Sequence, residues 1–223
     1  MTLSEQFHTC GYAITPPLLS PVTCAALHRK TARLTQSVGT RSLLRHPWCM
    51  ALAQRLFRHP GLASLLPVTA MAVQCTFFEK SSEKNWLVPW HQDLSLPMAT
   101  GMAHPAFKGW SEKEGQIFAQ PPASLLEQIT VVRLQLDDAA ADNGALRVVP
   151  RSHRHGRLDD AAIQTLRQRY PEKLCVVPAG AAMVMRPLLL HASSKAISRR
   201  PRRVLHFLFA PADLLKPFDL SWT

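Results

Sequence analysis

Two side chains that could bind one metal ion stand two residues apart in the stretch VPWHQDL, residues 88–94. Alternate residues of a strand point to the same side, so His91 and Asp93 would present an imidazole and a carboxylate together. A further histidine, His191, ends an apolar run far downstream. Two histidines and one carboxylate leave three coordination positions open, which is typical of oxygen-activating Fe(II). The sequence therefore predicts a metal site built from two distant segments.

The elements that must position these residues are mostly short strands. The N-terminal part predicts a strand over residues 11–14 and two helices, one from the Ser20-Pro21 start to about residue 34 and one over residues 42–57. Apolar or alternating β-prone runs then predict strands at 71–78, 86–90, 129–136, 145–149, 181–185 and 203–209. Many short strands after a helical pair favour a mainly β fold with flanking helices, an antiparallel barrel or sandwich of jelly-roll type.

The domain organisation expected from 223 residues is one domain, residues 1–223. Residues 1–66 would form a strand and helices that pack on a barrel made by residues 67–223. Residues 97–122 contain several glycines and prolines, so we expect a long irregular segment there. A long loop directly after a metal motif is a candidate lid.

Composition and cysteine usage exclude several classes of protein. The longest apolar runs are too short or are broken by Pro67, so no membrane span is expected. The first residues lack the pattern of a signal peptide, so we expect a cytoplasmic protein. The five cysteines are odd in number, scattered and without a C-x-x-C pair, which argues against a disulfide framework and a zinc site.

The formal net charge of +11 has more than one reading. The basic residues are spread along the chain without an aromatic-interleaved motif, so nucleic-acid binding is not favoured. Anionic small-molecule substrates and solubility explain the charge equally well. The densest cluster is Arg199, Arg200, Arg202 and Arg203. The sequence does not define the oligomeric state.

Three blocks in this order resemble the phytanoyl-CoA dioxygenase-like Fe(II)/2-oxoglutarate oxygenases. They are WHQDL at 90–94, DNGALRVVPRSH at 142–153, and HASS at 191–194 followed by the arginines. The resemblance implies a double-stranded β-helix of cupin-like type, with Fe(II), 2-oxoglutarate and O2 as cofactors and co-substrates. It also implies His91, Asp93 and His191 as the metal ligands. The implied reaction hydroxylates an unactivated C–H bond and releases succinate and CO2.

A charge count explains why such a site needs an arginine. Fe(II) with one carboxylate is singly positive, and the 2-oxoglutarate dianion would make the site singly negative. A buried unpaired carboxylate is costly, so a guanidinium should pair with the end of 2-oxoglutarate remote from iron. The family position indicates Arg202 first and Arg203 second, because a one-residue register slip decides which one points inward. Gln74 resembles a family position that contacts 2-oxoglutarate.

Several further residues have two readings. Thr130 and Arg133 could line the pocket or belong to the core or surface, and His206 could be structural or line the pocket. Trp86, Trp90 and Trp110 are candidates for a wall that keeps water out, although the first two could equally be core. His153 and His155 belong to a turn block whose family role is architectural.

Three functions remain open at this level. The first is a hydroxylase of a small molecule, with an anionic one among the options; the carboxylate of Asp93 favours hydroxylation, since related halogenases have a small residue there. The second is an oxygenase of a coenzyme-linked or carrier-linked acyl group. The third is a basic β-barrel binding module with a vestigial triad. The identity of the substrate does not follow from the sequence.

Overall fold

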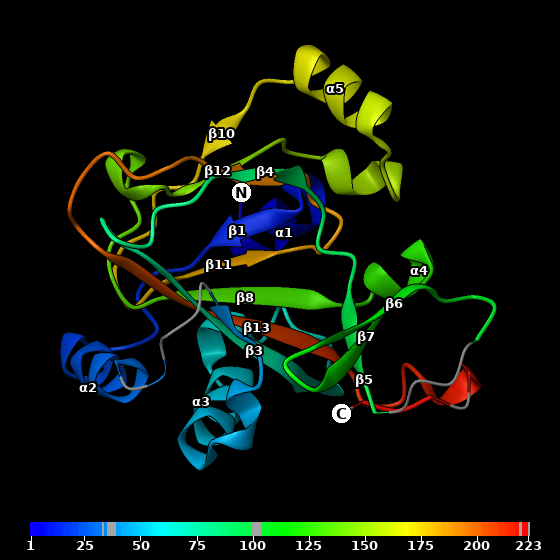
Figure 1. Ribbon diagram of the computed structural model, residues 1–223, viewed down its shortest axis with the longest axis horizontal. Helices are drawn as coiled ribbons and strands as arrows, with labels where there is room; N and C mark the ends of the chain where they lie inside the picture. Colours follow the sequence, from blue (N-terminus) through cyan, green and yellow to red (C-terminus); the bar gives the residue numbers. More distant parts are fainter. Residues whose placement is uncertain (33, 35–38, 100–103, 219, 223) are drawn as a thin grey trace.

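The centre of the molecule is a six-stranded antiparallel sheet with the strand order β1-β11-β8-β13-β3-β2 (Figure 1). The computed structural model describes all residues except 33, 35–38, 100–103, 219 and 223. The strands of this large sheet are β1 (Tyr12–Ile14), β2 (Gly39–Thr40), β3 (Ala70–Lys80), β8 (Thr130–Gln135), β11 (Ala182–Met185) and β13 (Arg202–Pro211). The long pair β3 and β13 gives the sheet its length.

A smaller four-stranded sheet of order β10-β9-β12-β4 lies over the large one (Figure 1). Its strands are β4 (Val88–His91), β9 (Leu146–Val148), β10 (Lys173–Leu174) and β12 (His191–Ser193). From β8 onward the chain passes back and forth between the two sheets, with β8, β11 and β13 in the large one and β9, β10 and β12 in the smaller one, which is the winding of a jelly roll. The fold is thus the mainly β, double-stranded β-helix predicted from the sequence.

The segment after the smaller sheet's first strand is not irregular, which corrects the prediction of a long loop over residues 97–122. It forms a three-stranded sheet of β5 (Leu96–Met98), β6 (Lys108–Lys113) and β7 (Gln116–Gln120). Glu114 and Gly115 both have positive φ, 55° and 69°, which is the two-residue hairpin turn that matches strand twist. Residues 100–103 of the predicted lid lie outside the described part of the chain.

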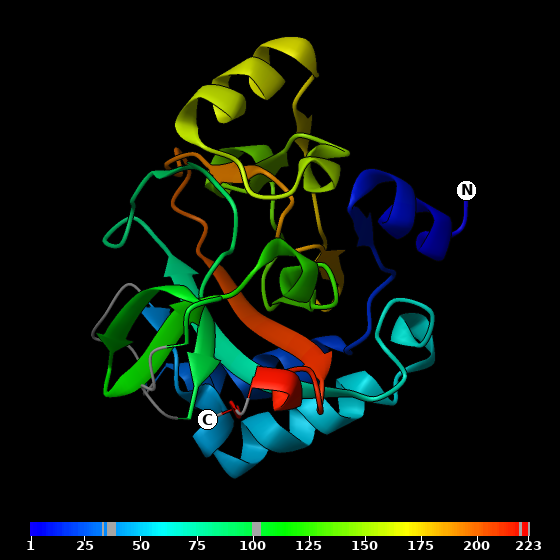
Figure 2. The ribbon, with the colours of Figure 1, turned by 90° about the vertical axis from the view of Figure 1, so that its right-hand side faces the viewer.

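Helices cover the outer face of the large sheet, as Figure 2 shows for the blue and cyan helices beside β13. They are α1 (Leu3–Cys10), α2 (Pro21–Thr31) and α3 (Pro47–Phe57). Leu27 of α2 and Leu56 of α3 share one core cluster with Phe77 and Phe207 of the sheet. The N-terminal helices thus pack on the barrel strands; the division at residues 66 and 67 stays a prediction.

Two helix predictions need correction. The helix expected over residues 42–57 is broken at His46, which is extended because Pro47 follows it. A 3₁₀ turn (Leu43–Arg45) precedes the break, and α3 begins at Pro47. The helix α1 was not predicted, although its capping box of Thr2 and Glu5 is readable in the sequence.

The remaining helices connect strands. They are α4 (Ala123–Leu126), α5 (Asp160–Arg169) and 3₁₀ turns at Pro60–Leu62, Ala141–Asn143, Ser152–His155 and Lys216–Phe218. In the part of the chain that the structure describes, no helix has the length and apolar character needed to cross a membrane. All five cysteines are free thiols, as their spacing predicts.

Candidate active site

Three side chains that could hold a metal ion meet at one edge of the smaller sheet. His91 is the last residue of β4 and His191 the first of β12, and their Cα atoms are paired across the two strands. Asp93 follows two residues after His91, and its backbone N–H donates to the carbonyl of Pro187 at 2.9 Å. One ligand atom from each of His91, Asp93 and His191 lies within 4.8 Å of the other two. The fold thus assembles the three side chains that the sequence separates.

The two imidazoles are held in the same way by the backbone. Nδ1 of His91 is 2.8 Å from the carbonyl oxygen of Pro89, and Nδ1 of His191 is 2.8 Å from that of Leu189. A carbonyl only accepts, so each Nδ1 carries the proton and each Nε2 keeps its lone pair. Both Nε2 atoms face Asp93, at 3.7 Å and 3.8 Å from its oxygens. This tautomer is the one that metal-binding histidines adopt.

The carboxylate of Asp93 is the unsatisfied group at the centre. Its Oδ2 is buried and has no hydrogen-bond partner among the described residues. Burial alone would raise the pKa of Asp93, but His191, His206 and His91 lower it to about 2. Burial, and after it His91, lowers the pKa of His191 to about 4. A negative carboxylate that faces the Nε2 atoms of both imidazoles fits a divalent cation bound by all three groups.

A fourth histidine, His206, reaches the site from β13 but is not free to be a ligand. Nη1 of Arg133 is 2.7 Å from Nδ1 of His206, and because a guanidinium can only donate, Nδ1 must accept. The ring proton of His206 is then on Nε2, which faces Oδ2 of Asp93 at 3.7 Å. Burial lowers the pKa of His206 to about 3, so the ring is neutral. His206 and Arg133 therefore form a layer behind the carboxylate.

The two neighbouring arginines of β13 point to opposite faces. Arg202 is 4% exposed and lines the cavity beside the three metal-binding residues. Arg203 instead makes a paired contact with Asp137 on the other face, with Nε and Nη2 each 2.8 Å from a carboxylate oxygen. Consecutive residues of a strand point to opposite faces of the sheet, so the register of β13 decides which arginine faces the cavity. Arg202 is the residue that the cavity can use.

Lys80 joins Arg202 in a way that the sequence did not predict. Lys80 lies beyond the strand predicted over residues 71–78, yet it is the last residue of β3, 1% exposed, and paired with Arg202 across the sheet. Its Nζ donates to the hydroxyl of Ser193 at 2.8 Å and the carbonyl of Ser194 at 2.6 Å. Burial, and after it Arg202, lowers the pKa of Lys80 to about 8. Only the strand pairing reveals this second cation.

Arg202, His206 and the three possible metal ligands line a cavity of about 460 Å³ between the two sheets. Gln74, Trp86 and Arg133 line it too, and Phe118 of β7 shows that the segment predicted as a lid does form one wall. Thr130 does not line it and bonds to the carbonyl of Leu65. The other predicted wall residues also lie elsewhere: Trp90 lies under Arg147 and Arg167, and Trp110 contacts Phe107.

Gln92, between the two ligand positions, was not singled out by the sequence. Its Nε2 donates to the carbonyls of Leu188 and Gly156, at 2.7 Å and 2.8 Å, and its Oε1 accepts from the N–H of Leu158. Leu188 precedes Leu189, whose carbonyl orients His191. Gln92 thus ties the first ligand segment to the turn that carries the second.

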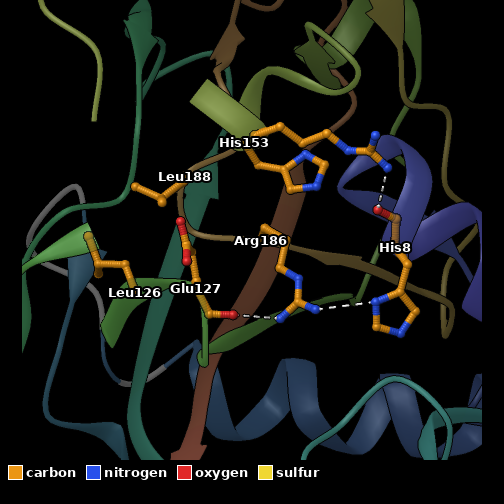
Figure 3. A pocket seen from close by; sticks show the side chains of 7 residues that line it. His8, Leu126, Glu127, His153, Arg186 and Leu188 are labelled. Carbon is orange, nitrogen blue, oxygen red and sulfur yellow. Dashed lines mark hydrogen bonds between the residues drawn. The ribbon is translucent and has the colours of Figure 1, made fainter. Parts of the chain in front are cut away.

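A second cavity, of about 330 Å³, lies on the outer side of that turn (Figure 3). Its central side chain, Arg186, donates to the carbonyl of Glu127 at 2.9 Å and lies 3.5 Å from Nδ1 of His8. The same guanidinium lies over the ring of Phe7, 4.4 Å from its centroid. Burial, and after it Arg186, lowers the pKa of His153 in this cavity to about 4. These contacts tie α1 and α4 to the end of β11, which suits the architectural role expected for His153.

Comparison with protein families gives a match over most of the chain. The family model described as phytanoyl-CoA dioxygenase matches residues 7–204. This range contains all three blocks on which the sequence resemblance rests. Comparison with curated proteins gives no significant match.

Solved structures share the fold at low sequence identity. AviO1 from Streptomyces viridochromogenes Tue57 has a TM-score of 0.64 and 20% identity, with 93% of each chain covered. EctD from S. alaskensis with bound Fe has a TM-score of 0.70 and 18% identity, with 94% of this chain and 76% of that one covered. The epimerase SnoN, in complex with Fe3+, alpha ketoglutarate and nogalamycin RO, has a TM-score of 0.64 and 17% identity, covering 94% and 82%. These likenesses establish the architecture.

Proposed function

This chain belongs to the phytanoyl-CoA dioxygenase family, and we propose that it hydroxylates an unactivated C–H bond of a small molecule. It is a non-haem iron and 2-oxoglutarate-dependent enzyme, with O2 as the other co-substrate. The residue roles and the reaction described below are our proposal.

In this proposal His91, Asp93 and His191 hold Fe(II). The observation that carries it is the common orientation of the two imidazoles, each fixed through Nδ1 by a backbone carbonyl so that Nε2 faces Asp93. Such outer contacts fix the tautomer and ring position of metal ligands. Oδ2 of Asp93, buried without a hydrogen-bond partner among the described residues, supplies the negative charge that a cation would balance.

Arg202 would bind the carboxylate of 2-oxoglutarate remote from the metal. It is buried in the cavity, and among the described side chains none forms an ion pair with it. Lys80 lies beside it and adds a second positive charge. Gln74 lines the same cavity but lies six residues from Lys80 along β3, so its contact with 2-oxoglutarate stays a prediction.

When bound, the iron and 2-oxoglutarate supply the oxidising chemistry, with succinate and CO2 as the by-products. The chain itself positions the substrate and excludes water. Trp86 and Phe78 on one side and Phe118 on the other form the apolar part of the cavity wall. They would hold a substrate C–H bond near the metal-binding triad.

The two other functions are less well supported. No described feature favours a coenzyme-linked or carrier-linked acyl group over a free small molecule. A binding module with a vestigial triad would not need a complete donor set with both imidazoles oriented for metal, which the three side chains provide.

An anaerobic titration with Fe(II) and 2-oxoglutarate tests the proposal. We expect a weak visible metal-to-ligand charge-transfer band, and slow succinate formation once O2 is admitted. His91→Ala and His191→Ala should each abolish both signals, since each removes one of three protein ligands. His8→Ala, an exposed histidine in the second cavity, should retain them. Absence of the band from the wild type, or full turnover in either ligand variant, would reject the assignment.

A further inference from the structure

We propose that the substrate is a small organic anion, most simply a carboxylate, and that Arg133 binds its charged group. The inference rests on the proposed function, because it concerns the substrate of the same site. It adds a substrate class and a specificity-determining residue that the metal ligands and the 2-oxoglutarate site do not provide.

Arg133 is a buried cation that the protein leaves without an anionic partner. It lies in the middle of β8, is 6% exposed and lines the cavity. Its one hydrogen bond among the described residues is to the neutral ring of His206, and its Nε is buried without any partner. No carboxylate in the described part of the chain lies within ion-pair distance of it. An arginine stays protonated in proteins, so this charge must be met by something else.

The only carboxylate that lines the cavity, among the described residues, is committed to the metal. Asp93 stabilises the charge of Arg133 at a distance, but a bound divalent cation would draw on the same carboxylate. The two positive charges of a divalent cation and the two negative charges of the 2-oxoglutarate dianion cancel each other. Arg133 and Arg202 in the cavity, with Lys80 beside Arg202, then outnumber the one carboxylate of Asp93, which leaves two positive charges in excess at the site. An anionic substrate lowers that excess where burial makes it costly.

The two cavity arginines are placed for two different anions. Arg133 pairs with His206 across the sheet, and the backbone of His206 lies four residues from that of Arg202 along β13, about 13 Å at roughly 3.3 Å per residue. Arg202 lies at the Lys80 end of the sheet, while Arg133 lies behind Asp93. One 2-oxoglutarate molecule bound to Arg202 and the metal therefore leaves Arg133 for a second molecule.

The cavity wall also favours an anion on its way in. Arg41 and Lys113 both line the cavity, and Arg41 is neutralised by Glu114 at 2.9 Å. Lys113 lies over the ring of Phe118, 5.5 Å from its centroid, with no ion pair among the described residues. A positive charge at such a point raises the local concentration of anions.

Matched pairs of neutral and charged probes test the inference. We would load the protein anaerobically with Fe(II) and saturating 2-oxoglutarate, and measure the Kd of isobutyrate against isobutyramide and of cyclohexanecarboxylate against cyclohexanecarboxamide by calorimetry. Within each pair the shape is nearly constant and the charge changes. The wild type should bind at least one carboxylate about tenfold or more tightly than its amide, since a charge-assisted contact contributes about 1.5–3 kcal/mol.

Substitutions test whether Arg133 causes the preference for a carboxylate over its amide. Arg133→Gln should abolish it while leaving the Kd of 2-oxoglutarate unchanged, and Arg133→Lys should retain part of it because the charge remains. Arg186→Gln, which removes a half-buried arginine from the second cavity, should keep that preference in full.

Several outcomes would overturn the inference. One is a wild type that binds neither carboxylate more tightly than its amide, a result that does not depend on how any variant folds. Another is a preference that survives in Arg133→Gln. A third is an Arg133→Gln variant that binds 2-oxoglutarate as weakly as Arg202→Gln, which would make Arg133 a co-substrate residue. Failure of the proposed function is seen separately, as the absence of the charge-transfer band before any probe is added.

Discussion

Each of the two cavities contains an arginine, Arg186 half-buried and Arg133 buried, and the two differ in their hydrogen-bond partners. Arg186 in the outer cavity contacts the carbonyl of Glu127, the ring nitrogen of His8 and the face of Phe7. Arg133 in the inner cavity also lies over an aromatic ring, that of Phe78, but it has one neutral hydrogen-bond partner and a buried Nε without any among the described residues. The protein completes the first environment by itself and leaves the second incomplete.

By this difference, Arg186 is a cation that stabilises the fold, and Arg133 is one that a ligand could bind. A buried polar group without a partner is costly, so it persists where another molecule satisfies it. The same contrast appears between Arg203, paired with Asp137, and Arg202, which no described side chain pairs. The variants below separate ligand binding from stability on this basis.

The largest effect is expected at the inner cavity, in Arg202→Gln. Removing one member of a buried charge pair costs about 3 kcal/mol or more, so the Kd of 2-oxoglutarate should rise about 100-fold. Arg203→Gln is the control on the neighbouring residue, and it should lower stability while leaving that Kd unchanged. Titrations followed by the charge-transfer band give both values. An equal rise in the two variants would remove the distinction between the two faces of β13.

At the outer cavity, Arg186→Gln should act on the fold alone. It removes hydrogen bonds from a charged donor and the contact with Phe7, so the free energy of unfolding should fall by about 2 kcal/mol. Urea denaturation measures this loss. If the variant instead bound 2-oxoglutarate much more weakly at unchanged stability, the outer arginine would have the role assigned to the inner ones.

A smaller effect is expected at Gln92, which lines the inner cavity and donates to the carbonyl of Leu188, a residue that lines the outer cavity. Gln92→Ala removes the contacts to Leu188 and Gly156 that hold the ligand-bearing turn. Loss of such an outer contact typically weakens metal binding about tenfold, and the Fe(II) Kd should change accordingly. An unchanged Fe(II) affinity with reduced stability would show that Gln92 supports the fold without positioning the ligands.

The last expected effect is on the pH dependence of stability. His153 in the outer cavity has a folded pKa of about 4, below its ordinary value of 6.5, so the unfolded chain takes up the proton first as the pH falls. Stability should therefore decline from about pH 6.5 to about pH 4 and level off with respect to this group below that. His153→Gln cannot titrate and should show a shallower decline in urea midpoints at pH 7, 6 and 5. An unaltered slope would contradict the assignment to His153.

Much of the fold was readable because burial imposes a period on the sequence. The strands β3, β8 and β13 were predicted within a few residues, as were Ser20 and Pro21 at the start of α2. The hairpin of β6 and β7 was missed because β6 is polar and mostly exposed, so no alternation marks it. Its signal was the Glu114-Gly115 turn.

The sequence by itself determined the donor types of the metal site, because H-x-D at the end of one strand and a histidine at the start of another carry the chemistry whatever the packing. The family resemblance also implied an arginine after His191. Only the tertiary structure decided which of Arg202 and Arg203 lines the cavity, since the register of β13 selects the inward face. Strand pairing likewise brought Lys80 beside Arg202 and Arg133 beside His206. Contacts between distant strands set which charges are left without partners, and no local pattern records them.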